Sequence, residues 1–440
     1  MPPSNYNTKL RTMVLLNGRG RYLWLVIFLF ANQRLLVSQK ISIDECYQWA
    51  TLNSPLENQI NLIEKAKMYA LRNANLGYLP QASLSGQFTW QSEVTGIPFA
   101  LPNVEIPKIP KDQYKATIDV SQNIWDGGYI HSQKQITIAA AKVEVEGVET
   151  SLYQLKEQIT NYYFSALLAQ KQFDNITVAK KEIERQLSRQ KANLENGTTI
   201  KSNIMSLEAR LIEMGQTQRE IRSKKISALK ALSILTGKEI SGDAELNAPN
   251  EAVSVNAPID RPELRQLDAQ KQLIEANKHG INARYSPKLN LFATGGYGRP
   301  ALNFLSPDFS PYFIGGAVIK IPLSHLYSGL HSNDKTIQDI QKEKIENQKN
   351  LFIQQLQIKI EAQKEDMARI QDQIKEDMRI IEIRGYIKSN AEVKLNNGVI
   401  TVNEYITEVD NETKAKQNLD LHKIQLQQTI QAIKITLGDK

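Results

Sequence analysis

The sequence contains few residues of the kinds that build metal centres or disulfides. Its 440 residues include one cysteine, Cys46, and five scattered histidines with no pair at helical ligand spacing. A single cysteine can form neither an internal disulfide nor a cysteine-cluster metal site, and we expect it to be a thiol buried in a helix. No nucleophile, base and orienting group stand in a recognisable motif. We therefore predict no metal, no cofactor and no enzymatic activity.

Proline and glycine are missing from long tracts of the chain, which predicts long helices with narrow apolar seams rather than a thick core. The formal net charge of +7 is spread along these tracts, with acidic residues interleaved. Such a pattern is typical of solvated helix faces. The absence of a clustered basic patch argues against nucleic acid as a partner.

An uncharged apolar run, residues 22–33, follows four basic residues near the N-terminus: Lys9, Arg11, Arg19 and Arg21. Basic residues before a short apolar run are typical of a secretory signal peptide, and the run is short for a membrane-spanning helix. We predict a signal peptide over residues 1–38, with cleavage after Ser38. The alternative is an uncleaved anchor helix.

Two stretches alternate between apolar and polar residues, as strands with one apolar and one polar face do. The first runs from Pro80 to Gln91 and the second from Tyr114 to Ser121. Strands of about ten residues with this pattern fit a membrane-spanning hairpin of an outer-membrane barrel, apolar outward and polar inward. The predicted lipid-facing residues are Leu84, Phe88, Trp90, Ile118 and Val120. The alternative is a surface hairpin of a soluble domain.

Landmarks of different kinds recur in the same order at a nearly constant spacing, which is the signature of an internal repeat. Two pairs are 207 positions apart: Pro55 with Pro262, and Pro80 with Pro287. Three further pairs are 201 positions apart: Gly128 with Gly329, Asn196-Gly197 with Asn397-Gly398, and Gly237 with Gly438. The chain is therefore predicted to be a tandem duplication of a unit of about 200 residues.

Each repeat has the same predicted plan: a helix, a β-hairpin, a very long helix and a return helix. In the first repeat, 39–240, these elements cover residues 42–75, 80–125, 128–195 and 198–236. An equatorial linker over 241–258 leads to the second repeat, 259–440, with elements at 260–284, 287–322, 329–396 and 399–437. Both first helices begin with a capping-box pattern. The two patterns are Ser42 with Glu45, and Asp260 with Glu263.

The first return helix carries apolar residues at alternating spacings of four and three, a coiled-coil register that serves packing. They are Ile200, Ile204, Leu207, Leu211, Met214, Ile221, Ala228, Leu232 and Leu235. At ~1.5 Å per residue the long helix spans roughly 100 Å, and the return helix followed by the next upper helix spans ~95 Å. These lengths predict one long helix beside two stacked shorter ones. Residues 237–258 would then lie outside the point where the stacked helices meet.

Four membrane strands per chain are too few to close a barrel. An open edge in lipid leaves backbone groups unpaired, at several kcal/mol each. Closed bacterial barrels start at about eight strands, so at least two copies of the chain must combine. The strand number alone does not choose between two copies and three.

Four motifs occur in order and in duplicated form. In the first repeat they are Leu79-Pro80-Gln-Ala, Gln122-Asn-Ile-Trp-Asp-Gly-Gly128, the Asn196-Gly197 turn and Leu235-Thr-Gly237. The set resembles the TolC-like outer-membrane efflux proteins over about residues 40–440. The resemblance implies a mainly α fold with a β-barrel portion: a homotrimer with a twelve-stranded barrel in the outer-membrane lipid and a helical tunnel in the periplasm. It also implies docking to a periplasmic membrane-fusion adaptor and to an inner-membrane pump of the RND, ABC or MFS type.

The resemblance also implies roles for two groups of residues. The turns match the adaptor-contacting tips of the family: Asn196, Gly197 and Thr198, and Asn397, Gly398 and Val399. The family places two acidic residues, three positions apart, after the second tip, where they form rings at the closed periplasmic aperture. The first position is Glu404, and the second is Thr407, with Glu408 beside it, so the second acid is displaced. Without the resemblance these residues read as plain turns and solvated surface groups.

The predicted function is an outer-membrane channel of a tripartite efflux or secretion system, which passively conducts substrates from the pump to the outside. The alternative is a periplasmic coiled-coil adaptor or scaffold without a pore. An adaptor normally carries one helical hairpin between split β-rich halves. Here long helices occur twice, each beside an amphipathic hairpin, which favours the channel.

Overall fold

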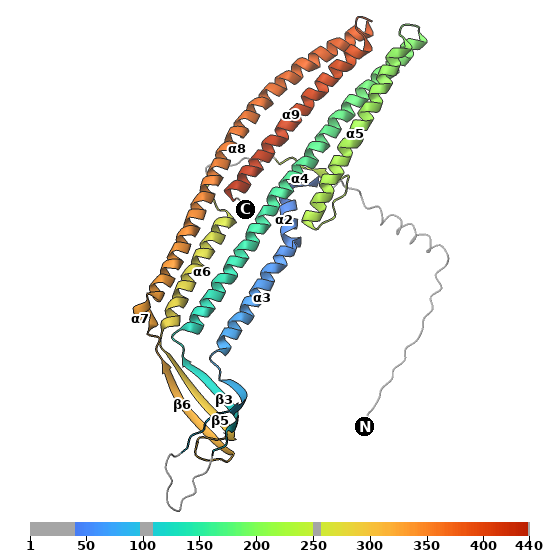
Figure 1. The fold of residues 1–440 in the computed structure, drawn as a ribbon. Helices are drawn as coiled ribbons and strands as arrows, with labels where there is room; N and C mark the ends of the chain where they lie inside the picture. The colour runs from blue at the N-terminus through green and yellow to red at the C-terminus, as the bar shows by residue number, and fades with distance from the viewer. Residues whose placement is uncertain (1–39, 97–108, 250–256, 439–440) are drawn as a thin grey trace, which may run out of the picture.

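The computed structural model describes residues 40–96, 109–249 and 257–438. The predicted signal peptide, residues 1–38, lies outside these ranges, as do residues 250–256 of the predicted linker. The described chain is an elongated rod. A four-stranded sheet stands at one end, and a curved layer of helices extends from it to two helical tips at the other end (Figure 1).

The sheet is built from two hairpins. The first contains β2 (Gln81–Trp90) and β3 (Asp112–Trp125), and the second contains β5 (Lys288–Arg299) and β6 (Ser310–Lys320). All pairings are antiparallel in the order β2-β3-β5-β6, so β3 of one hairpin lies against β5 of the other. A separate parallel pair, β1 (Lys40–Ile41) with β4 (Glu245–Leu246), joins the start of the described chain to the linker. No pattern in the residues predicted this pair.

Two helices of 67 residues each, α4 (Tyr129–Glu195) and α8 (Leu330–Asn396), run from the sheet to the tips. The helices beside them are α2 (Ile43–Asn53), α3 (Pro55–Leu76), α5 (Lys201–Thr236), α6 (Pro262–Tyr285) and α9 (Val402–Leu437). A short helix, α7 (Ser324–Ser328), follows β6. The predicted fold class, mainly helical with long hairpins and four antiparallel strands, is confirmed.

The first predicted helix, residues 42–75, is in fact two helices that meet at Ser54. A residue before proline is disfavoured in the helical conformation, and Pro55 lacks the backbone N–H that would continue the helix. Ser54 is extended and caps α3, its hydroxyl accepting from the Leu56 N–H at 3.2 Å. The capping box predicted at the start of α2 is confirmed, because the Ser42 N–H donates to the Glu45 carboxylate at 2.8 Å.

The capping box predicted for Asp260 and Glu263 is wrong. Helix α6 starts after Arg261 without a side-chain cap. The Glu263 carboxylate accepts from the Arg261 Nε at 2.9 Å rather than from a backbone N–H. The reason is that an ion pair with a guanidinium is stronger than a bond to a neutral amide. The Asp260 N–H donates to the Leu437 carbonyl at 2.8 Å, which joins the start of α6 to the end of α9.

The stacking of the shorter helices also differs from the prediction. The length argument placed the first return helix in line with the next upper helix along the chain, which means α5 with α6. Instead α9 lies in line with α6, and α5 lies in line with α2 and α3 (Figure 1). Asn53 Nδ2 donates to the Thr236 carbonyl at 2.9 Å where α2 meets α5. Each half of the chain therefore closes on itself, and the linker crosses from one half to the other.

Glycines at the ends of the return helices make both junctions possible. Gly237 and Gly438 have left-handed backbones, with φ of 62° and 94°. A Cβ on Gly438 would stand 2.2 Å from the Asp260 carbonyl oxygen, and a Cβ on Gly237 would stand 2.7 Å from the Asn53 Cβ. Only glycine allows the left-handed turn together with such a close approach.

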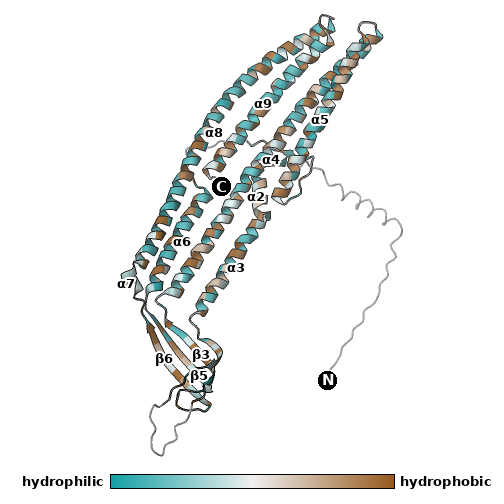
Figure 2. Cartoon of the chain, viewed as in Figure 1, coloured by the Kyte–Doolittle hydropathy of each residue, from teal (hydrophilic) through white to brown (hydrophobic). Residues whose placement is uncertain are grey.

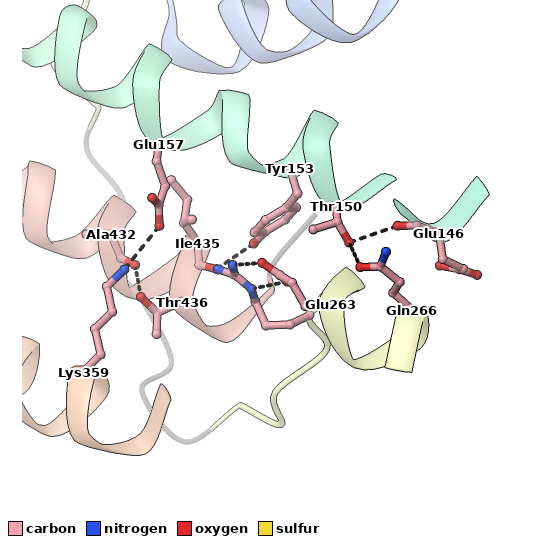
Figure 3. Close-up of polar contacts among 11 residues, drawn as sticks. Glu146, Thr150, Tyr153, Glu157, Glu263, Gln266, Lys359, Ala432, Ile435 and Thr436 are labelled. Atoms are coloured by element: carbon pink, nitrogen blue, oxygen red, sulfur yellow. Dashed lines mark hydrogen bonds and ion pairs between the residues drawn. The ribbon is translucent and has the colours of Figure 1, made fainter. Parts of the chain in front are cut away.

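The α9–α6 junction is bound to α4 by buried polar groups (Figure 3). The Ile435 carbonyl accepts from the Tyr153 hydroxyl and from Arg261 Nη1, at 2.8 Å in each case. The Arg261 guanidinium also lies over the Tyr153 ring, 4.7 Å from its centroid. Carbonyls at a helix C-terminus lack partners within the helix. The contacts from α4 and α6 therefore add two stronger hydrogen bonds to a carbonyl that otherwise accepts only from the Gly438 N–H, at 3.2 Å.

The largest core lies where α2, α4 and α5 meet the β1–β4 pair. Tyr163 and Phe164 of α4 are buried there with their rings edge to face, and the Tyr163 hydroxyl donates to the Ile41 carbonyl at 2.8 Å. Cys46 belongs to the same core, and burial raises the pKa of its thiol to about 12. The prediction of a thiol buried in a helix is confirmed.

The predicted seam of α5 is confirmed over most of its length. Its buried members are Ile204, Leu207, Met214, Ile221, Ala228 and Leu232, and Leu211 and Leu235 are partly buried. Ile200 is the exception. It is the N-cap residue before α5 and is exposed at the tip.

Within the described ranges, no helix combines the length and apolar content that crossing a membrane requires. In the same residues, no three or more His, Cys, Asp or Glu side chains are grouped so that they could hold a metal ion.

Candidate functional site

The four-stranded sheet has two free edges. In the described chain β2 and β6 are the outermost strands, and each pairs with a neighbour on one side. Both present a row of backbone N–H and C=O groups that another strand can pair with. The sheet is therefore an open segment rather than a closed structure.

The strand register places the five predicted lipid-facing residues on one face. Leu84 lies opposite Ile118, and Val120 lies opposite Ala82 on the same face. Phe88 lies opposite Tyr114, with ring centroids 5.0 Å apart. The Leu84 side chain is 80% exposed, and those of Phe88 and Trp90 are 62% and 68% exposed. The second hairpin continues this apolar face with Leu291, Phe313 and Ile319.

Aromatic residues stand at both ends of the apolar face. At the end away from the helices, the group is Trp90, Tyr114, Tyr297 and Phe309, with the Phe309 ring stacked on that of Tyr297 at 5.8 Å. At the helix end, the group is Tyr78, Trp125 and Tyr327. An apolar band between two aromatic girdles is the pattern of strands that cross an outer membrane.

The charges on the apolar face neutralise each other. Asp112 and Arg299 form an ion pair at the outer end of the strands. The Arg299 guanidinium lies over two aromatic rings, 5.6 Å from the Tyr114 centroid and 5.1 Å from that of Phe309. The pair therefore adds no net charge to this face.

The two helical tips have the same backbone turn. Gly197 and Gly398 are left-handed, with φ of 74° and 72°. Thr198 N–H donates to the Asn193 carbonyl at 2.9 Å, and Val399 N–H donates to the Lys394 carbonyl at 2.8 Å. These six-to-one bonds are those of a Schellman motif, which ends a helix at a left-handed glycine.

The starts of the two return helices differ. Helix α5 has no side-chain cap after Ile200, whereas α9 begins with a capping box formed by Thr401 and Glu404. The Thr401 N–H donates to the Glu404 carboxylate at 2.7 Å, and the Thr401 hydroxyl donates to it at 2.9 Å. These two bonds hold the pKa of Glu404 below its ordinary value.

An open cavity of about 690 Å³ lies between the two tips. Both tips contribute to its lining, which includes Thr198, Ile200, Asn203, Asn397, Thr401 and Glu404. Four of the six predicted tip residues, Thr198, Asn397, Gly398 and Val399, therefore share one concave surface with Glu404, the first predicted aperture residue.

The other two predicted aperture residues have partners inside the chain. The Thr407 hydroxyl donates to the Asn403 carbonyl at 2.9 Å. The Glu408 carboxylate lies 3.5 Å from Arg384 Nη1 of α8. Of the three residues, Glu404 has the carboxylate without a cationic partner in the described chain.

A partly buried ionic cluster joins the two hairpins below the tips, and the sequence reading missed it. Lys388 of α8 lies 3.1 Å from Glu182 of α4 and 2.9 Å from Glu412 of α9. The Tyr405 hydroxyl donates to Glu182 at 3.1 Å. Burial alone would lower the pKa of Lys388, but its hydrogen bonds to Glu412 and Glu182 raise it. Each partner lies on a different helix, so no local motif indicated the cluster.

No protein-family model matches the chain, and no curated protein sequence matches it. Solved structures do match. The channel-forming protein CusC is 14% identical, with a TM-score of 0.67 over 90% of this chain and 92% of CusC. The outer membrane protein VceC of Vibrio cholerae is 15% identical, with a TM-score of 0.64 over 90% of this chain and 96% of VceC.

The MtrE outer membrane channel of Neisseria gonorrhoeae is 12% identical, with a TM-score of 0.62 over 90% of this chain and 88% of MtrE. All three matches cover both the sheet end and the helical end, because nine-tenths of the chain is aligned in each. The chain therefore has the fold of the TolC-like outer-membrane channels.

Proposed function

We propose that this protein is the outer-membrane channel of a tripartite efflux or secretion system. It conducts substrates passively from an inner-membrane pump and a periplasmic adaptor to the outside. The observation that carries the proposal is the open-edged sheet, with one continuous apolar face between two aromatic groups, joined to 67-residue helices. Such helices are roughly 100 Å long at ~1.5 Å per residue, which suits a tunnel across the periplasm.

The free strand edges support a homotrimer. In lipid, unpaired backbone groups are costly, so β2 of one copy pairs with β6 of the next until the ring closes. Three copies give twelve strands, which is within the range of closed outer-membrane barrels. The exposed apolar side chains of α8, among them Ile358 and Tyr386, pack in the same assembly against the neighbouring copy.

The two faces of the sheet and the two tips take separate roles in this assembly. Leu84, Phe88, Trp90, Ile118 and Val120 face lipid, and the opposite face lines the channel. The tip residues Asn196, Gly197, Thr198, Asn397, Gly398 and Val399 contact the adaptor, in keeping with the cavity that both tips line.

Glu404 is the proposed aperture residue, and it also caps α9. Its carboxylate accepts bonds from Thr401 and has no cationic partner among the residues that the structure describes, so three copies place three negative charges at the periplasmic mouth. Rings of carboxylates attract cations in channels. Thr407 and Glu408 stand beside this ring, and Arg384 offsets the charge of Glu408.

The matched substitutions Leu84→Lys and Ser85→Lys test the proposal on adjacent residues of opposite faces. A lysine on the lipid face near the bilayer centre costs about 2–4 kcal/mol, so Leu84→Lys is expected to leave the outer-membrane fraction and lose the trimer. Ser85→Lys is expected to assemble normally, since it points into the channel. The measurement is fractionation followed by gel electrophoresis in mild detergent.

Equal assembly of both variants would contradict the assignment of the faces. Release of the unsubstituted protein from cells by osmotic shock or salt would instead identify a periplasmic scaffold. A detergent-stable trimer in the outer-membrane fraction supports the channel.

A further inference from the structure

The polar face of the sheet carries a net positive charge. By the strand register its charged residues are Lys115 and Asp119 of β3, Lys288 of β5 and Lys320 of β6. Three cations and one anion leave two positive charges per chain on this face. The apolar face differs, because its Asp112–Arg299 pair is neutral.

The three lysines are not neutralised locally. Within the described residues, Lys115, Lys288 and Lys320 form no ion pair with a carboxylate. Lys288 and Lys320 lie directly opposite each other in the β5–β6 register. Like charges at opposed positions are destabilising, so this pair creates a concentrated field rather than a stabilising contact. Lys288 Nζ is 5.1 Å from the centre of the Tyr129 ring, at the junction with α4.

The acidic residue on this face, Asp119, is hydrogen-bonded to side chains of the sheet itself. Asp119 accepts from the Thr117 hydroxyl at 3.0 Å and from the Thr294 hydroxyl at 2.6 Å. Lys115 stands four residues away on the same strand, about 13 Å at ~3.3 Å per residue, which is too far for an ion pair. The carboxylate therefore offsets part of the field but does not pair with any of the lysines.

Two aromatic side chains on the polar face lie flat against the sheet. The Tyr312 ring covers Gly296, with its Cζ 2.3 Å from the place where a Cβ would stand. The Phe292 ring covers Gly316 in the same way, with Cε1 at 3.0 Å. Because these rings pack on glycines, they do not project into the channel. The lysines on the polar face are therefore not shielded from the channel by these rings.

We propose that the barrel segment of this protein favours anions, and that the Lys288–Lys320 pair is the first basic ring that a solute meets after the helical tunnel. The inference rests on the proposed function, because it requires the polar face to line a channel. A water-filled cleft with low-dielectric walls and one sign of charge concentrates ions of the opposite sign. The solutes favoured by this segment are those with exposed carboxylate, phosphate or sulfate groups.

The test uses the full-length trimer in planar bilayers at ~0.1 M KCl, where the Debye length is about 10 Å and the charges are not fully screened. The reversal potential in a salt gradient gives the chloride-to-potassium permeability ratio. The double variant Lys288→Gln, Lys320→Gln is expected to lower this ratio roughly sevenfold, because a loss of about one kT of surface potential lowers local chloride by a factor of ~2.7 and raises local potassium by the same factor. Asp119→Asn is the matched control and is expected to raise it.

Tripolyphosphate locates the effect in the channel. Added to the chamber that faces the sheet, it is expected to block the unsubstituted channel at lower concentration than the double variant. Added to the chamber that faces the tips, it reaches the Lys288–Lys320 ring through the helical tunnel and is expected to distinguish the two channels in the same order. Opposite shifts of the permeability ratio in the double variant and in Asp119→Asn cannot come from general misfolding.

Unchanged permeability ratios in both variants, with normal conductance, would overturn the inference and leave the proposed function standing. Equal block of the unsubstituted channel and the double variant from the sheet side would also overturn it. Absence of any conductance from the unsubstituted trimer would contradict the proposed function itself.

Discussion

The two halves of the chain follow one plan, yet their long helices are buried to different extents. Both α4 and α8 have 67 residues, but nineteen side chains of α4 are buried against seven of α8. Helix α4 packs against α3 and α5 on one side and against α6 and α9 on the other, whereas α8 packs against α6 and α9. Figure 2 shows α8 as predominantly hydrophilic along its length.

The difference is visible at equivalent positions. Tyr163 and Leu167 are buried in α4, and the residues 201 positions later in α8 are Lys364 and Ala368. The apolar side chains that α8 does carry, such as Ile358 and Tyr386, are 64% and 73% exposed. The first half therefore contains its own packing, while the second half presents an edge that another copy of the chain can cover.

The strongest test of this contrast is to remove a large side chain from each long helix. Phe164→Ala in the core of α4 is expected to lower the free energy of unfolding by about 3–5 kcal/mol, because it leaves a cavity that its neighbours cannot fill. Ile358→Ala on the exposed face of α8 is expected to change it by less than about 0.5 kcal/mol.

Denaturant unfolding of both variants, alongside the trimer fraction on size-exclusion chromatography, separates the two effects. We expect Ile358→Ala to loosen the trimer and Phe164→Ala to weaken the fold. A larger loss of folding stability for Ile358→Ala would break the comparison.

The junctions where the return helices end should respond to the same substitution by different amounts. Gly438→Ala introduces a left-handed alanine against the Asp260 carbonyl, and Gly237→Ala introduces one against the side chain of Asn53. Left-handed backbone strain costs roughly 1–2 kcal/mol per residue. The overlap is also greater at Gly438, where the new Cβ would stand 2.2 Å from the Asp260 carbonyl oxygen, than at Gly237, where it would stand 2.7 Å from the Asn53 Cβ. Thermal melts of the two variants should therefore show the greater loss for Gly438→Ala.

The two tips differ in their caps, and the difference can be reversed by exchange. Thr401→Ala removes the capping side chain of α9 and is expected to cost about 1 kcal/mol of local stability. Ile200→Thr supplies a capping hydroxyl to α5 and is expected to protect its first turn. Amide hydrogen exchange at residues 201–204 and 402–405 measures both. Equal exchange at the two tips of the unsubstituted protein would show that the capping box has no effect.

Acid should affect the second tip before the first. Hydrogen bonds from the Thr401 N–H and hydroxyl lower the pKa of Glu404 from its ordinary 4.5. A lowered pKa in the folded state gives stability that is complete above pH 4.5 and is lost as the pH falls through the lowered value. Exchange at residues 402–405 should thus rise below pH 4.5, relative to intrinsic rates, while that at residues 201–204 follows the intrinsic rates. In Glu404→Gln this difference should disappear.

Patterns carried by the chain itself predicted much of the fold. Alternation in residues 81–90 and 114–121 indicated strands, the heptad-like seam of α5 indicated its buried face, and paired landmarks predicted two halves with the same order of elements. Each of these signals depends on a residue and its near neighbours. They need no knowledge of what lies across the fold.

Features that depend on distant partners were missed or mistaken. The break at Ser54–Pro55 was also missed, although a local rule covers it, because a residue before proline is disfavoured in the helical conformation. No local rule covers the stacking of α9 on α6, because it depends on the contact of Leu437 and Gly438 with Asp260. The Asp260 cap failed for a similar reason, since Arg261 binds Glu263 and reaches Ile435 at the same time.

At the candidate site, the same limit separated what was found from what was missed. The tip turns follow from Asn-Gly pairs and were located by sequence. The Lys388 cluster and the charge of the polar face emerge only when helices and strands are placed side by side.

The glycine endings of α5 and α9 give the rod a mechanical division. The two long helices pass unbroken from sheet to tip, whereas the columns beside them are interrupted at Gly237 and Gly438. A force applied at the tips therefore acts on two continuous helices, α4 and α8, and on two columns of shorter helices that are divided at these glycines. The columns can tilt at Gly237 and Gly438 without bending a helix, and α4 and α8 carry the strain to the sheet.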